Sequence, residues 1–262
     1  MKLVGNKKSK ITDFNCDLGQ SFGVYKNDIE FELLEYSSSV NIACGFHAGD
    51  PQTIKRALLA CKEQNVAIGG HIGFQDIAGF GYNPTNLSDE ALESMVIYQL
   101  GALSSFAKSL GLEIEHVRPH GAMYKMAVED FQFSLKLAKA IKKFDPWLIY
   151  FGAAGQALQN VADELNIRVA HELFLDKKYN FDGSINFEAN EIVSTEDSIK
   201  RLNLLLDENS IDNIEGGKTE VKFDTIHFGS KAINAIELIK KATEIVTPIS
   251  VNYNQVEASD WE

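Results

Sequence analysis

The sequence predicts an α/β protein built as one TIM-like barrel of parallel strands with helices outside it. Short apolar runs alternate with helical patterns, and polar or glycine-rich loops separate them. This unit recurs about seven times along the 262 residues, without any repeat of the sequence itself. Seven or eight strand–helix units in a chain of this length suit a barrel, and a doubly wound open sheet is the competing architecture.

Seven apolar runs are the expected strands, since each is short and bounded by polar or glycine-containing segments. In chain order they cover residues 11–16, 39–43, 66–70, 115–118, 148–151, 167–170 and 223–228. Residues 249–253 are the candidate for an eighth strand.

The expected helices have recognisable starts and inner faces. Asp50 and Pro51 supply an N-cap carboxylate and a proline at the first helical position. The clearest helix covers residues 88–110, with acidic residues in its first turn and Gly111 after its end. Further helices are expected over 131–143, 156–165, 195–208 and 231–245, and residues 207–222 are expected to form a surface loop.

Composition restricts the function classes. The formal net charge of -12 disfavours nucleic acid and anionic membrane surfaces as partners. No stretch approaches the roughly 20 apolar residues of a membrane helix, and the lysine-rich start does not resemble a signal peptide. Three cysteines without CxxC spacing indicate free thiols and a cytoplasmic protein. We expect a single domain over 1–262, with an N-terminal extension at 1–10.

Polar side chains gather where the expected strands end, which is where parallel α/β folds bind their ligands. Five of the six histidines lie at such ends, and His116 is expected to face the outer helices. The strand-end residues are Asp13, Asn15 and Asp17 in the first strand, His47 and Asp50 after the second, His71 after the third, His120 after the fourth, His171 and Glu172 after the sixth, and His227 in the last. The period of two along a strand places the three polar residues of the first strand on one face.

This set of side chains allows two kinds of chemistry. Imidazoles and carboxylates ligate zinc, manganese or a similar divalent ion, and they also serve as general acid and base near neutral pH. The sequence contains no HExxH motif, so both uses stay open. Gly217, Lys218 and Thr219 resemble the end of a phosphate-binding loop, but Asp212 stands where that motif needs a glycine.

Several long motifs resemble one known family. They are DFNCDLGQSFG at 13–23, SSVNIACGFHAGDP at 38–51, GGHIGFQDIAGFG at 69–81, YQLGAL at 98–103, RPHGAMY at 118–124 and HELFLDKKYNFDGSI at 171–185. In these motifs the chain resembles the LamB/YcsF family, which is the family of the A subunit of 5-oxoprolinase, over about residues 11–245.

The resemblance implies a seven-stranded, distorted TIM-like barrel of the glycoside hydrolase/deacetylase type. It also implies a part in the ATP-dependent hydrolysis of the lactam 5-oxoproline to L-glutamate, together with 5-oxoprolinase subunits B and C. The catalytic candidates are Asp13, His47, His71, His120, Glu172 and Asp176, and the substrate-binding candidates are Asn15, Asp17, Asp50, Arg118 and Tyr124. Asp13, His47, His71 and His120 are also the candidate ligands of a divalent metal.

The chain departs from the family pattern at several positions. Gln20 replaces an acid, Tyr82 and Asn83 replace two arginines, Lys177 replaces another arginine, and Phe228 and Ser230 stand in the segment where the family has its last histidine and aspartate. His227 is expected to point to the opposite face from that lost histidine.

These departures leave two other functions open. One is a metal-dependent deacetylase or amidohydrolase that acts on a small N-acyl or carbohydrate substrate. The other is a non-catalytic binding subunit. ATP is expected to bind this chain or its partner subunits, and a homo-oligomer also remains open.

Overall fold

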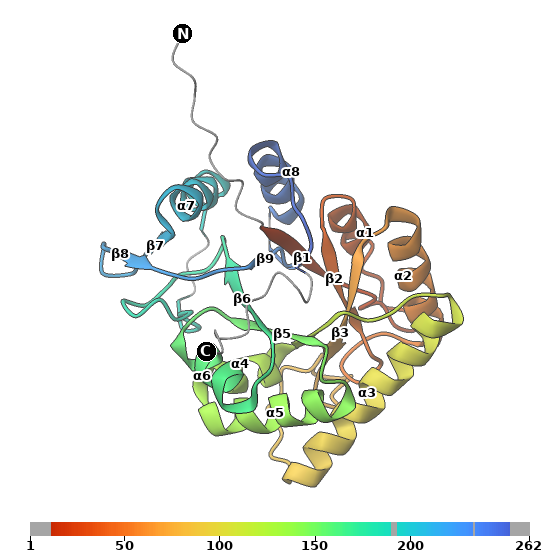
Figure 1. Cartoon of the computed structure of the whole chain (residues 1–262). Coiled ribbons are helices and arrows are strands. Elements are labelled where there is room, and N and C mark those ends of the chain that lie inside the picture. The colour runs from red at the N-terminus through yellow and green to blue at the C-terminus, as the bar shows by residue number, and fades with distance from the viewer. Residues whose placement is uncertain (1–11, 190–192, 233, 252–262) are drawn as a thin grey trace.

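Seven parallel strands form a closed barrel in the computed structural model, which describes residues 12–189, 193–232 and 234–251 (Figure 1). In order around the barrel they are β1 (Asp13–Leu18), β2 (Ser39–Ala43), β3 (Ala67–Ile72), β4 (His116–Pro119), β5 (Ile149–Ala153), β6 (Val169–Phe174) and β9 (Thr225–His227). β9 pairs with both β6 and β1 and so closes the barrel. The barrel prediction is confirmed, and the open sheet is wrong.

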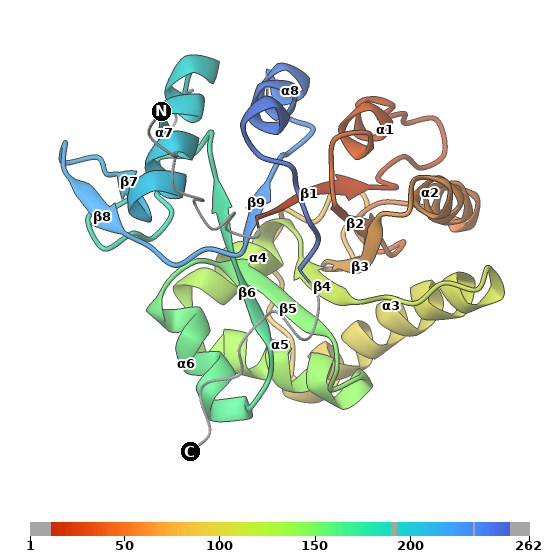
Figure 2. The ribbon, with the colours of Figure 1, turned by 45° about the horizontal axis from the view of Figure 1, so that its top comes forward.

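Eight helices within the described residues surround the strands (Figures 1 and 2). They are α1 (Ile29–Leu34), α2 (Pro51–Gln64), α3 (Asp89–Ser109), α4 (Gly121–Glu129), α5 (Phe131–Phe144), α6 (Gln156–Leu165), α7 (Thr195–Glu208) and α8 (Ala235–Ile245). The predicted starts of α2 and α3 are confirmed, because Asp50 and Ser88 each accept a hydrogen bond from a backbone N–H of the first turn. None of the helices in these segments is long and apolar enough to cross a membrane.

The main apolar core lies between the barrel and its helices, while much of the barrel interior is polar. Along β1, the buried Phe14, Cys16 and Leu18 belong to the large apolar cluster. The alternating residues Asp13 and Asn15 are also fully buried, but they bond to polar partners on other strands. The prediction that the polar residues of this strand share a face is therefore confirmed.

A smaller apolar cluster fills the barrel below the polar residues. Ile149 and Phe151 of β5 and Ala170 of β6 pack with Val251, which lies beyond α8. The backbone N–H of Ile249, in the same segment, donates to the carbonyl of Thr12, just before β1. The segment after α8 therefore covers the N-terminal end of the barrel and leaves the opposite end for ligands.

Some predicted elements are corrected. Residues 207–222 are not only loop, since β7 (Ser210–Asp212) and β8 (Lys218–Glu220) pair as an antiparallel hairpin. Gly216, in its turn, has φ of 83°, and Arg201 binds Asp212 through two nitrogens. Residues 249–251 form no strand, while 252–253 and the N-terminal extension at 1–10 lie outside the described residues. The short α1 and α4 were not predicted.

Candidate active site

Asp13 lies deepest in the barrel and is held by three hydroxyl groups. Ser38 Oγ and Ser39 Oγ donate to its carboxylate over 2.6 and 2.8 Å, and Thr225 Oγ1 donates as well. Burial raises the pKa of Asp13 to about 6, although the three hydroxyl donors act in the opposite direction. Because Asp13 is fully buried and does not line the cavity at the barrel mouth, the structure places it below the groups that line that cavity.

Asn15, Asn41 and His116 form the next layer of the interior. Asn15 Oδ1 accepts from Asn41 Nδ2 over 2.8 Å, and Asn41 Oδ1 lies 2.9 Å from His116 Nε2. The His116 ring stacks on Phe151, with ring centres 4.1 Å apart. The prediction that His116 faces the outer helices is wrong. Gly69 on β3 makes this inward position possible, because a Cβ there would lie 2.2 Å from the imidazole.

Arg118 and Glu172 form a buried ion pair above this layer. Arg118 Nε lies 2.8 Å from Glu172 Oε1, and Nη2 lies 2.9 Å from Oε2. Burial alone would raise the pKa of Glu172, but the guanidinium lowers it below its ordinary value. The Tyr124 ring lies 4.9 Å from the guanidinium carbon. Glu172 is thus an ionised, fully engaged carboxylate that orients Arg118.

Asp17 connects this ion pair to the histidines. Its Oδ1 lies 3.4 Å from Arg118 Nη1, and its Oδ2 lies 3.3 Å from His71 Nε2 and 3.7 Å from His227 Nε2. Burial would raise the pKa of Asp17, yet the neighbouring histidines and Arg118 hold it well below its ordinary value. Asp17 is therefore a carboxylate at the C-terminal end of the barrel, where ligands bind in such folds.

His227 faces the barrel interior, which corrects the expectation that it points away. Thr225 and His227 lie on the same face of β9, and His227 Nδ1 lies 2.8 Å from Asn15 Oδ1. An amide oxygen only accepts, so Nδ1 carries the proton and Nε2 is left as an acceptor toward the cavity. Burial lowers the pKa of His227 to about 4, which keeps the ring neutral at pH 7.

Three further histidines meet beside Asp17 at the barrel mouth. His71 is the next-to-last residue of β3, His120 immediately precedes α4, and His47 lies in the loop after β2. His120 Nδ1 lies 2.9 Å from His71 Nε2, and the rings of His47 and His120 stack with centres 4.0 Å apart. One ring nitrogen from each residue lies within 4.8 Å of the other two. The sequence-based expectation that these side chains converge is confirmed.

A cavity of about 310 Å³ opens above these groups. Its polar and aromatic lining comes from the C-terminal ends of strands, from the loops that follow them and from α4: Asp17, Gln20, Tyr82, Arg118, His120, Tyr124, Phe174, Asp176, Lys177, His227, Ser230 and Lys231. Four of the positions that depart from the family pattern, Gln20, Tyr82, Lys177 and Ser230, are in this lining. These four departures therefore concern the ligand, whereas Phe228 packs in the apolar core against Phe14.

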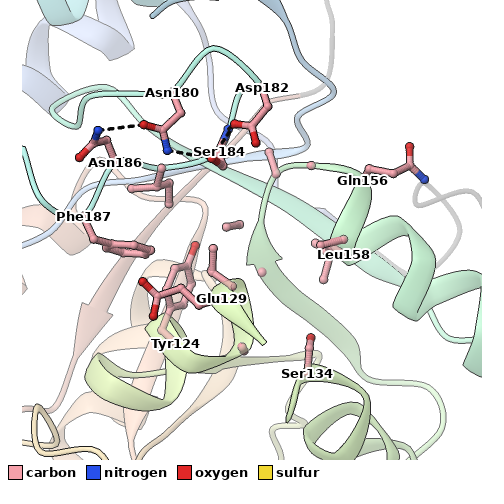
Figure 3. Close-up of a pocket in the computed structure, with 18 of the residues that line it drawn as sticks. Tyr124, Glu129, Ser134, Gln156, Leu158, Asn180, Asp182, Ser184, Asn186 and Phe187 are labelled. Atoms are coloured by element: carbon pink, nitrogen blue, oxygen red, sulfur yellow. Dashed lines mark hydrogen bonds between the residues drawn. The ribbon is translucent and has the colours of Figure 1, made fainter. Parts of the chain in front are cut away.

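A larger cavity of about 620 Å³ lies beside the first (Figure 3). Tyr124, Ile185 and Phe187 line both cavities and so form the wall between them. The lining of the larger one includes Glu129 but none of the histidines. The smaller cavity, where cations, carboxylates and imidazoles converge, is therefore the candidate site.

The structure separates the predicted site residues. At the mouth lie Asp17, His47, His71, Arg118, His120, Tyr124, Glu172 and Asp176, whereas Asp13 and Asn15 lie deeper in the barrel. Asp50 accepts from the backbone N–H of Thr53 and caps α2, and it does not line the cavity.

Sequence reasoning missed Lys231 and Phe80 near the mouth. Lys231 lines the cavity, with Nζ 4.1 Å from the centre of the Phe80 ring, and the Phe80 carbonyl accepts from His120 over 2.8 Å. Phe80 has φ of 53°, which is uncommon for a residue other than glycine. The glycines on both sides of Phe80 were the available sequence signal for an unusual backbone here.

Comparisons with known proteins agree with this fold. The LamB/YcsF family model matches residues 12–260. The A subunit of 5-oxoprolinase from Clostridium beijerinckii is 39% identical over 232 residues, which are 87% of this chain and 91% of that protein. The corresponding protein of Bacillus cereus, which bears the same name, is 40% identical over 240 residues, which are 89% of this chain and 95% of that protein.

A solved structure shows the same architecture. The lactam utilization protein of Thermus thermophilus superposes with a TM-score of 0.86 at 33% identity, covering 92% of this chain and all of that one. The barrel, the motifs at its mouth and the extent of these matches lead to one conclusion: this chain belongs to the LamB/YcsF family.

Proposed function

We propose that this chain is the A component of a 5-oxoprolinase, which hydrolyses the lactam 5-oxoproline to L-glutamate at the expense of ATP. The observation that carries the proposal is the cavity of about 310 Å³ at the barrel mouth, which combines cations, two carboxylates and neutral imidazoles. Its size suits a small ligand. Relatives that match most of this chain are named as the A component of 5-oxoprolinase.

The charges of the cavity match the groups of the substrate. The charge of Arg118 is largely compensated by Glu172 and Asp17, so Lys177 and Lys231 are the cations left for the carboxylate of 5-oxoproline. Asp17 can accept a hydrogen bond from the lactam N–H. This orientation directs the ring carbonyl toward the imidazoles.

His227 is the residue we assign to positioning water. Its Nε2 is an acceptor directed toward the cavity, because Nδ1 is bound to Asn15. Positioned proton acceptors typically contribute about 10²–10⁴-fold to a rate. A water held by Nε2 would give a proton to His227 and attack the carbonyl carbon. The ring C–N bond would break as the nitrogen takes up that proton and becomes the amine of glutamate, and the phosphoryl group from ATP would leave as inorganic phosphate.

ATP and the partner subunits complete the proposal. An unstrained lactam resists hydrolysis, and phosphorylation of its carbonyl oxygen would make the ring carbon a better electrophile. Lys218 lies in the β7–β8 hairpin and pairs with Glu208, which disfavours Gly217–Thr219 as a phosphate loop. We therefore assign ATP binding to subunits B and C or to their interface with this chain. The three buried, unpaired cysteines favour the cytoplasm.

Reconstitution tests this function. The chain is combined with its B and C partners, and 5-oxoproline-dependent ATP hydrolysis and glutamate formation are measured. We expect both activities only in the full complex. His227→Ala should reduce the rate by about 10²–10⁴-fold, while Asp50→Ala should retain it because Asp50 caps α2 away from the cavity. An assembled complex that forms no glutamate would contradict the proposal.

The three-histidine cluster supports a second candidate, a metal-dependent deacetylase or amidohydrolase that acts on a small N-acyl or carbohydrate substrate. This function needs neither partner subunits nor ATP. Release of acetate from N-acetylated sugars by the chain alone would favour it over the lactam reaction.

A further inference from the structure

The hydrogen bonds around His71 and His120 leave two lone pairs facing each other. His71 Nδ1 lies 3.1 Å from the carbonyl of Arg118, and His120 Nε2 lies 2.8 Å from the carbonyl of Phe80. A carbonyl oxygen only accepts, so each of these nitrogens carries a proton. In neutral rings, the other two nitrogens, His71 Nε2 and His120 Nδ1, are then unprotonated.

These two unprotonated nitrogens are only 2.9 Å apart. Two lone pairs at this distance repel each other unless a positive charge lies between or beside them. Asp17 Oδ2, which is 3.3 Å from His71 Nε2, adds a negative charge to the same place. A positive charge beside these nitrogens, either a proton on His71 Nε2 or a bound cation, removes this repulsion.

We propose that His47, His71, His120 and Asp17 bind one first-row divalent metal ion, of which Zn²⁺ is the representative. In a tetrahedral site with Zn–N bonds of about 2.0–2.1 Å, neighbouring ligand atoms are separated by roughly 3.3 Å. The observed separations of 2.9 and 3.3 Å are close to this value. The site does not depend on the proposed lactam reaction.

His47 supplies an independent observation. It is fully buried, and neither of its ring nitrogens has a hydrogen-bond partner. An unpaired buried imidazole is costly. The ring stacks on His120 and must tilt to reach a shared ion, but this movement breaks no hydrogen bond. Glycine at position 73 provides the space that the His47 ring needs, because a Cβ there would lie 2.6 Å from His47 Nδ1.

The hydrogen bonds behind the histidines match those of known metal sites. Metal-bound histidines usually donate their other N–H to a carbonyl or carboxylate, which fixes the ring and its tautomer. His71 and His120 are positioned in this way by the carbonyls of Arg118 and Phe80. The donor set of three imidazoles and one carboxylate suits zinc and its neighbours rather than Mg²⁺ or Ca²⁺. Asp17 replaces Asp13 of the sequence-based ligand set, since Asp13 lies deeper in the barrel.

Cobalt binding tests the site without any measurement of activity. The full-length protein is freed of metal with a chelator and titrated with Co²⁺, whose visible absorption reports tetrahedral nitrogen and oxygen ligation. We expect one ion per chain, displacement by Zn²⁺, and a rise in the thermal unfolding temperature. His47→Ala should weaken binding by roughly 100-fold or more, since changing only a residue that supports a ligand already costs about 10–100-fold.

His171→Ala is the matched control, because His171 is also buried but lies outside the cluster and contacts Gln159. All six histidines are buried, so an exposed histidine cannot account for a signal. If His47→Ala does not fold, Asp17→Asn takes its place, with circular dichroism as the folding check. Absence of a cobalt band in the wild type, or an unchanged band in a folded cluster variant, would overturn the proposal.

Discussion

At the scale of single residues, the three polar residues that the sequence places on one face of the first strand lie at different depths in the barrel. Asp13, Asn15 and Asp17 share one face of β1, but they belong to successive levels of the barrel interior. The Asp13 carboxylate accepts from hydroxyl groups, whereas Asp17 contacts Arg118 and His71 beside the cavity. The pattern of alternation predicts the shared face, and it does not predict which level meets the ligand.

Asp13 should make the protein less stable as the pH rises. Its folded pKa of about 6 lies above the ordinary value of 3.8, so between these two values the folded state retains a proton that the unfolded state has lost. The free energy of unfolding therefore falls as the pH rises through this window and is constant above it. Chemical denaturation of the wild type and Asp13→Asn at a series of pH values measures this slope. If the free energy of unfolding depended on pH equally in the wild type and in Asp13→Asn, the raised pKa of Asp13 would be contradicted.

The Arg118–Glu172 pair should be costly to break from one side. Arg118→Met keeps much of the apolar stem but leaves Glu172 fully buried without its main partner. We expect a loss of about 3–5 kcal/mol in the free energy of unfolding. Adding Glu172→Gln removes the unpaired charge and should recover part of the loss. Additive effects of the two substitutions in denaturant titrations would show that the residues do not interact.

At the scale of elements, the sequence predicts the strands well. The barrel strands are buried, so each contains a short apolar run that stands out from the polar loops around it. The expected bounds of the second strand coincide with β2, and the other six strands overlap or adjoin their predictions within a few residues. The short α1 and the β7–β8 hairpin were missed, because each depends on tertiary contacts more than on a periodic pattern. Arg201, for example, reaches the hairpin from α7 to bind Asp212.

Side-chain direction was harder to predict than the strands themselves. His116 turns inward only because Gly69 on the neighbouring strand leaves space for its ring, and one strand alone does not reveal that neighbour. His227 was assigned to the wrong face because its position was counted from a family motif rather than from Thr225, its partner on the interior face of β9. Lys231 was expected to begin a helix over 231–245, but α8 begins only at Ala235, and Lys231 lies in the loop after β9, where it lines the cavity.

The cap of α2 provides a prediction at this scale. Asp50→Ala removes the acceptor of the Thr53 N–H and should lower the free energy of unfolding by about 1 kcal/mol. Because Asp50 does not line the cavity, ligand binding should be unchanged. Thermal unfolding and a ligand titration of the same preparation separate the two effects. If Asp50→Ala lost ligand binding while its free energy of unfolding stayed unchanged, Asp50 would be a ligand-binding residue and the prediction would be wrong.

At the scale of the whole molecule, the barrel has one covered end and one end with an open polar cavity. Val251 and its apolar neighbours fill the N-terminal end, and polar layers lead upward from there to the histidines and the cavity. Buried hydrogen bonds between strands fix the mouth groups from below. We therefore expect substitutions at the N-terminal end to affect stability and substitutions at the mouth to affect ligand binding.

Val251→Ala should reduce stability without affecting the mouth. It removes two buried methyl-sized groups from the cluster with Ile149 and Phe151, which is worth about 1.5 kcal/mol. The effect is read from the midpoint of denaturant unfolding. Weaker ligand binding at an unchanged unfolding midpoint would mean that the two ends of the barrel are not separate.

Calorimetric titration of 5-oxoproline tests most directly the claim that the mouth cavity holds the lactam. It is performed on the complex with the B and C subunits, without ATP. We expect one site per copy of this chain, binding weakened at least about tenfold by Lys231→Gln, which removes a cation of the cavity, and unchanged binding with Val251→Ala. Binding that is identical in the wild type and Lys231→Gln, or that persists in a complex lacking this chain, would contradict the account.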